Sequence, residues 1–537
     1  MLPTDPTWYK NAIFYEVYVR AFKDSNGDGH GDIHGLVEKL DYLKELGVDC
    51  LWLLPIYPSP LKDDGYDISD YCSIHPDYGS LEDFKRLLEE THRRGMRLIT
   101  DLVMNHTSDA HPWFQAARSD RHSPYRDYYV WSNDDRQYSQ ARIIFLDTEK
   151  SNWTWDPLAG QYFWHRFYAC QPDLNFDAPA VQAEMLRVVD FWLGFGVDGF
   201  RVDAVPYLFE REDTNCENLP ETHAYLKTLR RFVEEKYPGR LLLCEANQWP
   251  QDVRAYFGED DEFNMAFHFP LMPRVFMALK QGDRTPITWA LEQTPPIPEN
   301  CQWATFLRNH DELTLEMVSP EERQWMWAQY SPEMRMRLNL GIRRRLAPLL
   351  DNDRRKIELA YSLIFSLPGA PFLYYGDEIG MGDNIHLPDR NGVRTPMQWE
   401  DAPGAGFTSA SVPYIPVIQA DPYSAGSVNV AGQKADPASL WHSLRAMIAL
   451  RKRYPALRSG ELTWIPCPHP AVAAYLRRSN ADQVAVIQNL SGKPVPVELP
   501  FENSSAELTD LITGHVVPVQ NGRLKITLRP YEYLWLV

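Results

Sequence analysis

The chain of 537 residues contains no long apolar run and no excess of basic residues. A membrane-spanning helix needs roughly 20 predominantly apolar residues in a row. Because no such run occurs, we expect a soluble protein without a membrane partner. Lys and Arg number 54 against 73 Asp and Glu, which gives a formal net charge of −19. This charge repels phosphate backbones and anionic lipid surfaces, so we do not expect a nucleic-acid partner either.

Cysteine is scarce, and a secretory signal is lacking. The seven cysteines are an odd number without paired spacing, which is typical of reduced thiols rather than of a disulfide framework. The opening residues MLPTDPTWYK lack the basic patch and the apolar stretch of a secretory signal. We therefore expect a cytoplasmic protein. Aromatic residues, in contrast, are abundant at 13%, and their rings suit both core packing and the apolar faces of sugars.

Eight short β-prone segments end in polar residues and are followed by helix-like segments. Apolar residues recur at helical spacing in residues 81–94 and 183–193. Strands alternating with helices over about 450 residues predict an α/β fold, a (β/α)8 TIM barrel. The pattern is weakest in the sixth segment. The predicted strands are residues 13–19, 48–54, 97–103, 199–203, 241–245, 263–269, 303–307 and 371–375.

The chain is longer than one hydrophobic core supports, so we expect further domains. We assign the barrel to residues 1–106 and 182–455. Residues 107–181, rich in Trp, Tyr, Asp and Arg, are too long for a connecting loop and predict an inserted domain. In residues 456–537 the pattern changes to short alternating runs, which predicts a C-terminal antiparallel β-sandwich domain. Two smaller insertions in the barrel are expected at about residues 319–353 and 380–436.

Polar side chains follow four of the predicted strands. Barrel enzymes place catalysis at the carboxyl ends of their strands, so these residues are candidates for an active site. Each one alone could form a plain ion pair, because strand-end carboxylates and arginines often do. Their joint occurrence favours an active site. The candidates are Asp101, Asn105 and His106 after the third strand, Arg201 and Asp203 at the fourth, Glu245 at the fifth, and Asn309, His310 and Asp311 after the seventh.

These four segments, in this order, resemble the four signature regions of the α-amylase family of glycoside hydrolases. The resemblance implies that Asp203 is the nucleophile, Glu245 the general acid/base and Asp311 a stabiliser of the transition state. It also implies that Arg201 lies beside Asp203. His106 and His310 would bind hydroxyls of the glucosyl ring.

A retaining glucosyl transfer requires residues of the same types. Retaining transfer needs two carboxyl groups about 5–5.5 Å apart, one attacking the anomeric carbon and one protonating the leaving oxygen. Arg201, two residues before Asp203, shares its face of the strand, and its charge would keep Asp203 ionised. Glu245 must stay protonated until it donates, which a poorly solvated site would favour.

Two more segments resemble one branch of the family, which contains oligo-1,6-glucosidases, sucrose isomerases and trehalose synthases. Residues 171–175, QPDLN, are similar to the fifth signature region of this branch. Residues 63–67, DDGYD, are similar to its glucose-binding loop, in which Tyr66 would stack on the sugar. By the same resemblance Asp63 and Arg394 would pair and make a dead-end pocket that accepts small saccharides.

Within that branch, residues 141–156, 201–208 and 382–390 are most similar to enzymes that interconvert maltose and trehalose. This resemblance implies intramolecular glucosyl transfer on a disaccharide, with Asp203 carrying the glucosyl group and leaked water yielding a little glucose. It also implies a homo-oligomer, a dimer or a tetramer, and in some bacteria a maltokinase partner.

Other functions share the same machinery. A hydrolytic α-glucosidase or oligo-1,6-glucosidase and a sucrose isomerase stay open as alternatives, because the fold does not decide between transfer and hydrolysis. An inactive binding subunit is disfavoured, since such proteins usually lack one of the three carboxylates, and all three are present here.

Residues 24–32, DSNGDGHGD, carry oxygen donors at alternate positions with glycines between them, which suits a calcium loop. A metal-free polar turn is the alternative reading. The family resemblance implies calcium ligands at Asp24, Asn26, Asp28, the carbonyl of His30, and Asp32.

The resemblance to the maltose-converting enzymes implies a second calcium site. Its ligands would be Asn105, Asp173, Glu210 and the carbonyls of Tyr207 and Leu208. Both ions would be structural, because the glycosyl transfer itself needs no Lewis acid. No organic cofactor is expected.

Overall fold

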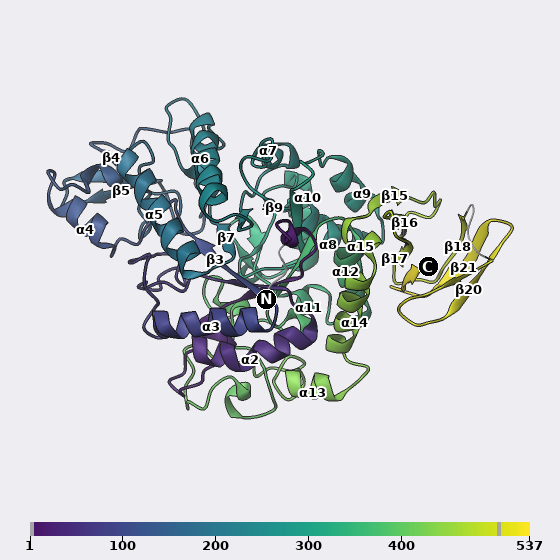
Figure 1. The fold of residues 1–537 in the computed structure, drawn as a ribbon. Coiled ribbons are helices and arrows are strands. Elements are labelled where there is room, and N and C mark those ends of the chain that lie inside the picture. Colours follow the sequence, from purple (N-terminus) through teal and green to yellow (C-terminus); the bar gives the residue numbers. More distant parts are fainter. Residues whose placement is uncertain (1–4, 502–505) are drawn as a thin grey trace.

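The computed structural model describes residues 5–501 and 506–537, and its centre is a closed barrel of eight parallel strands (Figure 1). Residues 1–4, part of the N-terminal segment in which we found no secretory signal, lie outside the described residues. The strand order is β1-β14-β10-β9-β8-β7-β3-β2. All eight predicted strands are confirmed, including the sixth. Their bounds are β1 Phe14–Val17, β2 Cys50–Leu53, β3 Arg97–Leu102, β7 Gly199–Val202, β8 Leu241–Cys244, β9 Met265–Phe267, β10 Gln302–Phe306 and β14 Ala370–Tyr374.

Helices cover the outside of the barrel, and so its strands are buried on both faces. α3 illustrates why a helix begins where it does: the hydroxyl of Ser80 accepts from the backbone N–H of Asp83, and the Asp83 carboxylate accepts in return from the Ser80 backbone. The helices around the barrel are α1 Val19–Phe22, α2 Ile33–Leu46, α3 Leu81–Arg93, α5 Pro179–Phe195, α6 Pro220–Lys236, α7 Pro250–Ala255, α8 Leu271–Gln281, α9 Thr285–Glu292, α12 Arg354–Ser366, α14 Leu440–Arg453 and α15 Pro455–Ser459.

The chain between β3 and α5 forms a small unit beside the barrel, at the left of Figure 1. Its three-stranded sheet has the order β4-β6-β5. Because α5 begins at Pro179, the last residues of the range 107–181 belong to a barrel helix. The elements of this unit are α4 Pro112–Ser119, the 3-10 helix η2 Arg126–Tyr128, β4 Trp131–Ser132, β5 Trp153–Asp156 and β6 Gln161–Trp164.

Two further excursions leave the barrel after β10 and after β14. The first carries a small sheet of order β11-β13-β12. The second is mostly irregular. Their elements are β11 Leu313–Thr314, α10 Pro320–Tyr330, η4 Met334–Met336, β12 Arg337–Leu338, β13 Gly341–Ile342 and α11 Leu346–Leu349 after β10, and η5 Asp377–Ile379, η6 Asn391–Val393, η7 Pro403–Gly406 and α13 Val430–Ala435 after β14. The short turns η1 Trp8–Lys10 and η3 Val205–Tyr207 complete the set.

The C-terminal domain consists of two antiparallel four-stranded sheets, which confirms the predicted fold class. A buried arginine joins it to the barrel: Arg477 of β16 donates to the carbonyl of Ser366 in α12, and also to that of Gly460 at 2.8 Å. The strands are β15 Glu461–Trp464, β16 Val472–Arg478, β17 Gln483–Asn489 and β22 Tyr533–Leu536 in one sheet, and β18 Val495–Pro500, β19 Glu507–Thr509, β20 Val516–Gln520 and β21 Arg523–Leu528 in the other.

Two further properties concern the described part of the chain. No helix in residues 5–501 or 506–537 combines the length and the apolar character that crossing a membrane requires. All seven cysteines are free thiols, five of them buried.

Candidate active site

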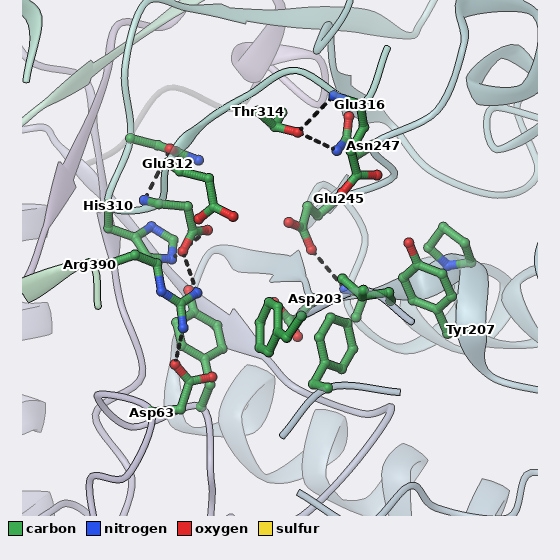
Figure 2. Close-up of a pocket in the computed structure, with 18 of the residues that line it drawn as sticks. Asp63, Asp203, Tyr207, Glu245, Asn247, His310, Glu312, Thr314, Glu316 and Arg390 are labelled. Carbon is green, nitrogen blue, oxygen red and sulfur yellow. Dashed lines mark hydrogen bonds and ion pairs between the residues drawn. The ribbon is translucent and has the colours of Figure 1, made fainter. Parts of the chain in front are cut away.

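A pocket opens at the carboxyl ends of the barrel strands (Figure 2). It encloses about 830 Å³ of empty space, which includes the open solvent at its mouth. Seven of the nine residues predicted to be catalytic or to bind substrate line it, whereas Arg201 and Arg394 lie behind the lining. The seven are Asp63, Tyr66, His106, Asp203, Glu245, His310 and Asp311.

The guanidinium of Arg201, which is 1% exposed, lies between three carboxylates. Its Nη1 is 2.6 Å from Asp101 Oδ1 and 2.5 Å from Asp203 Oδ1, and its Nη2 is 3.1 Å from Glu245 Oε1. The strand register explains this, because Asp101 of β3 and Arg201 of β7 are direct partners. Asp203 and Glu245 directly follow the neighbouring strands β7 and β8. One guanidinium therefore holds both predicted reactive carboxylates side by side.

Burial dominates the protonation of these carboxylates. It raises the pKa of Asp203 to about 7 and that of Glu245 to about 7, although Arg201 opposes the shift in both. It also raises the pKa of Asp101 to about 6. Arg201 favours the ionised form of Asp203, as we expected, but burial outweighs its charge and leaves the pKa of Asp203 raised.

Tyr66 and two neutral histidines form one wall of the pocket. The rings of Tyr66 and His310 stack with centroids 5.4 Å apart and an interplanar angle of 9°. Burial lowers the pKa of His106 to about 3 and that of His310 well below its usual value, so both rings are neutral near pH 7. Nε2 of His106 is buried without a hydrogen-bond partner and is available to a ligand hydroxyl. Nε2 of His310 is 3.1 Å from Asp311 Oδ2.

The partner of Asp63 is Arg390 and not Arg394. Arg390 Nη2 is 2.5 Å from Asp63 Oδ1 and its Nη1 is 2.9 Å from Asp311 Oδ1. Arg394 instead contacts Asp64 Oδ2 at 2.5 Å and Asp311 Oδ1 at 3.0 Å. Our pairing of Arg394 with Asp63 was wrong, because two arginines in one loop both reach this end of the pocket and the sequence does not order them. Figure 2 shows Arg390 reaching Asp63 there.

The rest of the pocket lining combines apolar and polar groups that the sequence did not single out. Ile144, Phe145 and Phe167 of the inserted unit belong to it, and the Phe145 ring lies 5.3 Å from the guanidinium of Arg390. Across from the predicted nucleophile lie Asn247, Thr314 and Glu316, with Asn247 Nδ2 donating to Thr314 Oγ1 at 3.0 Å (Figure 2). Apart from Thr314, which ends the two-residue strand β11, these residues stand in irregular segments, in which no periodic pattern points to a site.

Arg142 ties the inserted unit to the barrel loops. Its Nε is 2.8 Å from Glu217 Oε1, and its Nη1 is 2.8 Å from Glu316 Oε2. Its Nη2 donates to the hydroxyl of Tyr207 at 3.2 Å. Arg166 Nη2 contacts the same oxygen of Glu217 at 3.0 Å. Arg142 thus bridges two loops that follow different barrel strands.

The predicted second calcium set fits a cation. Asn105 Oδ1, Asp173 Oδ2 and Glu210 Oε1 are buried oxygens without a hydrogen-bond partner. Three such acceptors are costly to bury unless something neutralises or coordinates them. Oxygen donors of this kind are those that Ca²⁺ prefers.

The first predicted set has a different arrangement. Asp24 accepts from three backbone N–H groups and from Thr408, while Asp32 accepts from Ser25 and caps α2 at Gly35. Among the described residues, no three carboxylate, imidazole or thiol groups are arranged to hold a metal ion. The carboxylates of Asp24, Asp28 and Asp32 do not form such a group, and calcium binding at this loop stays a prediction.

Comparison with known proteins places the chain among carbohydrate-active enzymes. The model of the α-amylase catalytic domain matches residues 16–334 and 342–460, and that of the maltogenic amylase C-terminal domain matches residues 462–535. The chain is also similar over its whole length to a solved α-amylase from H. orenii. That comparison has a TM-score of 0.80 and 31% identity, and it covers 98% of this chain and 99% of the other.

Curated relatives are more similar still. The trehalose synthase/amylase TreS of Mycobacterium tuberculosis is 54% identical over 99% of this chain and 91% of its own. The trehalose synthase of Pimelobacter sp. is 53% identical over 100% of this chain and 96% of its own. The oligo-1,6-glucosidase of Parageobacillus thermoglucosidasius is only 33% identical, over 98% of both chains.

The two raised pKa values predict a bell-shaped pH dependence for turnover of an α-glucoside. Below about pH 7 both carboxyl groups become protonated and no nucleophile remains; above it both ionise and no acid remains. We expect kcat/KM to peak near pH 7 and to fall about tenfold per pH unit beyond each limb. Initial rates measured between pH 4 and 10 test this, and an optimum below pH 5 would contradict it.

Proposed function

The chain belongs to the α-amylase family of glycoside hydrolases, and from this premise we propose that it interconverts maltose and trehalose by intramolecular glucosyl transfer. The observation that carries the proposal is its identity of 53–54% to trehalose synthases along the whole chain, against 33% to an oligo-1,6-glucosidase. The pocket provides the residues for the reaction.

In the first step, the non-reducing glucose of maltose occupies the end of the pocket beside Asp63 and Tyr66. Asp203 attacks its anomeric carbon while Glu245 gives a proton to the glycosidic oxygen. The bond to that oxygen breaks, glucose is released inside the pocket, and a β-glucosyl ester forms on Asp203. Asp311, whose pKa the charges of Arg390 and Arg394 lower against the effect of burial, stays ionised and stabilises the developing positive charge.

In the second step, the released glucose turns over and presents its anomeric hydroxyl to the ester. Glu245, now a carboxylate, takes the proton of that hydroxyl, and the hydroxyl oxygen replaces Asp203 on the anomeric carbon. The product is α,α-trehalose, and both carboxyl groups return to their starting states. The same steps in reverse convert trehalose to maltose.

Two ion-pair clusters at the pocket support transfer over hydrolysis. At one end, we propose that the ion pair of Arg390 and Asp63 blocks the passage of a longer chain. At the other, Arg142 joins the inserted unit to the loops that carry Glu217 and Glu316. Keeping these walls together retains the free glucose and keeps water from the glucosyl ester.

The first test is incubation of purified protein with maltose, with trehalose and glucose followed by chromatography. Trehalose should be the main product and glucose a minor one. Asp203→Asn should lower both by at least about a thousandfold, because the nucleophile is lost. Glucose as the sole product would identify a hydrolytic α-glucosidase, and conversion of sucrose but not of maltose would identify a sucrose isomerase.

Removing the contacts by which Arg142 joins the inserted unit to the barrel loops should shift the reaction toward hydrolysis. Arg142→Met removes the contacts to Glu217, Glu316 and Tyr207, so water should enter more often. We expect the ratio of glucose to trehalose to rise about threefold to tenfold. Arg136→Met, which changes an exposed arginine of the same unit, is the matched control and should leave the ratio unchanged. An unaltered ratio in the Arg142 variant would refute the sealing role.

We further propose that Ca²⁺ binds at Asn105, Asp173 and Glu210, together with the carbonyls of Tyr207 and Leu208. The three unpartnered buried oxygens support this assignment. The ion would supply positive charge to a buried acidic cluster and fix the loop after β7 to the inserted unit. It takes no part in the transfer steps.

Calcium should therefore stabilise the fold. At a concentration a hundred times its dissociation constant, the gain in unfolding free energy is about 3 kcal/mol. We expect the unfolding temperature to drop in EDTA and to recover with Ca²⁺. Glu210→Gln should reduce this recovery, and Asp41→Asn, which changes an exposed carboxylate outside both predicted calcium sets, should preserve it. If Ca²⁺ raised the unfolding temperature of the Glu210 variant as much as that of the wild type, the assignment would be refuted.

The seven free thiols also fit a reducing compartment, in line with the expected cytoplasmic location.

A further inference from the structure

Asp64 stands beside the substrate pocket, yet the proposed reaction does not use it. It is not among the residues that line the pocket, and its side chain is 19% exposed. Its backbone φ of 49° lies in the left-handed region. That conformation costs a residue with a Cβ about 1 kcal/mol or more, and it persists where surrounding contacts hold it.

Two strong contacts occupy the Asp64 carboxylate. Oδ2 is 2.5 Å from Arg394 Nη1, and Oδ1 accepts from the hydroxyl of Tyr18 at 3.1 Å. Tyr18 is itself buried. Both carboxylate oxygens therefore have donors from outside the pocket, and the strained backbone points the side chain at Arg394 rather than at substrate.

Arg394 is held from several sides. Its Nη1 binds Asp64, its Nη2 is 3.0 Å from Asp311 Oδ1, and its Nε donates to the carbonyl of His310 at 2.9 Å. Its own carbonyl accepts from the hydroxyl of Tyr414 at 3.0 Å. Arg394 thus links Asp64 to Asp311, the carboxylate proposed to stabilise the transition state.

We propose that Asp64 is a positioning residue for the transfer: it fixes Arg394 and balances its charge, so that Arg394 orients Asp311 without cancelling its negative charge. This inference rests on the proposed function and on the role of Asp311 in it. It assigns a task to a residue that neither binds substrate nor reacts.

The charges at this end of the pocket explain why a second acid is needed. Arg390 and Arg394 both contact Oδ1 of Asp311. Asp63 and Asp389 balance the first arginine, and Asp64 balances the second. Without Asp64, Arg394 would have Asp311 as its remaining carboxylate partner among these contacts and would move onto it. In a buried site such an interaction is strong, so Asp311 would offer less charge to an oxocarbenium-like transition state.

Asp64→Asn tests the charge while keeping the backbone, because asparagine tolerates the left-handed region well. We expect kcat for maltose conversion to fall about tenfold or more, with KM changed by about twofold or less, since Asp311 acts mainly in the transition state. Asp64→Gly relieves the backbone strain but also lacks the carboxylate, and it should lose as much activity as Asp64→Asn.

Asp109→Asn is the matched control. It removes the ion pair that Asp109 forms with Lys62 at 2.8 Å, which is exposed and lies outside the pocket lining. Its kcat should equal that of the wild type. Unfolding temperatures of all variants separate a folding defect from a catalytic one. If Asp64→Asn does not fold, Tyr18→Phe removes one donor to Asp64 and should lower kcat about twofold to fivefold.

Several results would overturn the inference. These are a kcat within twofold of wild type in both Asp64 variants, a wild-type kcat in Asp64→Gly alone, or a raised KM at unchanged kcat. In the fallback, an unchanged kcat in Tyr18→Phe would count equally against it. A wild-type protein that does not convert maltose at all would instead refute the proposed function.

Discussion

One buried guanidinium sets the chemistry of this site. Arg201 is almost wholly buried, and the carboxylates of Asp101, Asp203 and Glu245 all contact it. Burying charges is costly unless they are paired and hydrogen-bonded. Three acids sharing one base cannot all be ionised at little cost, and so their pKa values rise toward neutrality. The barrel makes this sharing unavoidable, because β3, β7 and β8 are adjacent and their ends converge.

In the loops that follow the strands, acidic residues are again paired with arginines. Arg390 and Arg394 each have a partner in the loop after β2 and both contact Asp311 after β10. Arg142 joins the inserted unit to loops after two other strands. Ion pairs therefore hold segments that are far apart in sequence around one pocket. These loop segments are what the chain adds to the (β/α)8 barrel.

The barrel and the residues at its strand ends were predictable, because both depend on local patterns. Apolar runs ending in polar residues gave all eight strands, and barrel geometry then brings Asp203, Glu245 and Asp311 to one pocket. The partner of Asp63 was not predictable, because Arg390 and Arg394 stand in an irregular segment without a period. The raised pKa of Asp203 was missed for another reason: burial is a property of the folded chain and not of a spacing. The unpartnered oxygens of Asn105, Asp173 and Glu210 likewise exist only once three distant segments meet.

The closed end made by Arg390 and Asp63 has a consequence for how the two sugars compete. With that end blocked as proposed, a disaccharide enters the pocket with its non-reducing glucose first. Maltose has one such end, whereas trehalose is symmetrical and either of its rings can lead. Every collision of trehalose with the mouth thus has two productive orientations where maltose has one. The symmetry of the product alone gives it a twofold advantage in binding, before any contact in the pocket distinguishes the two sugars.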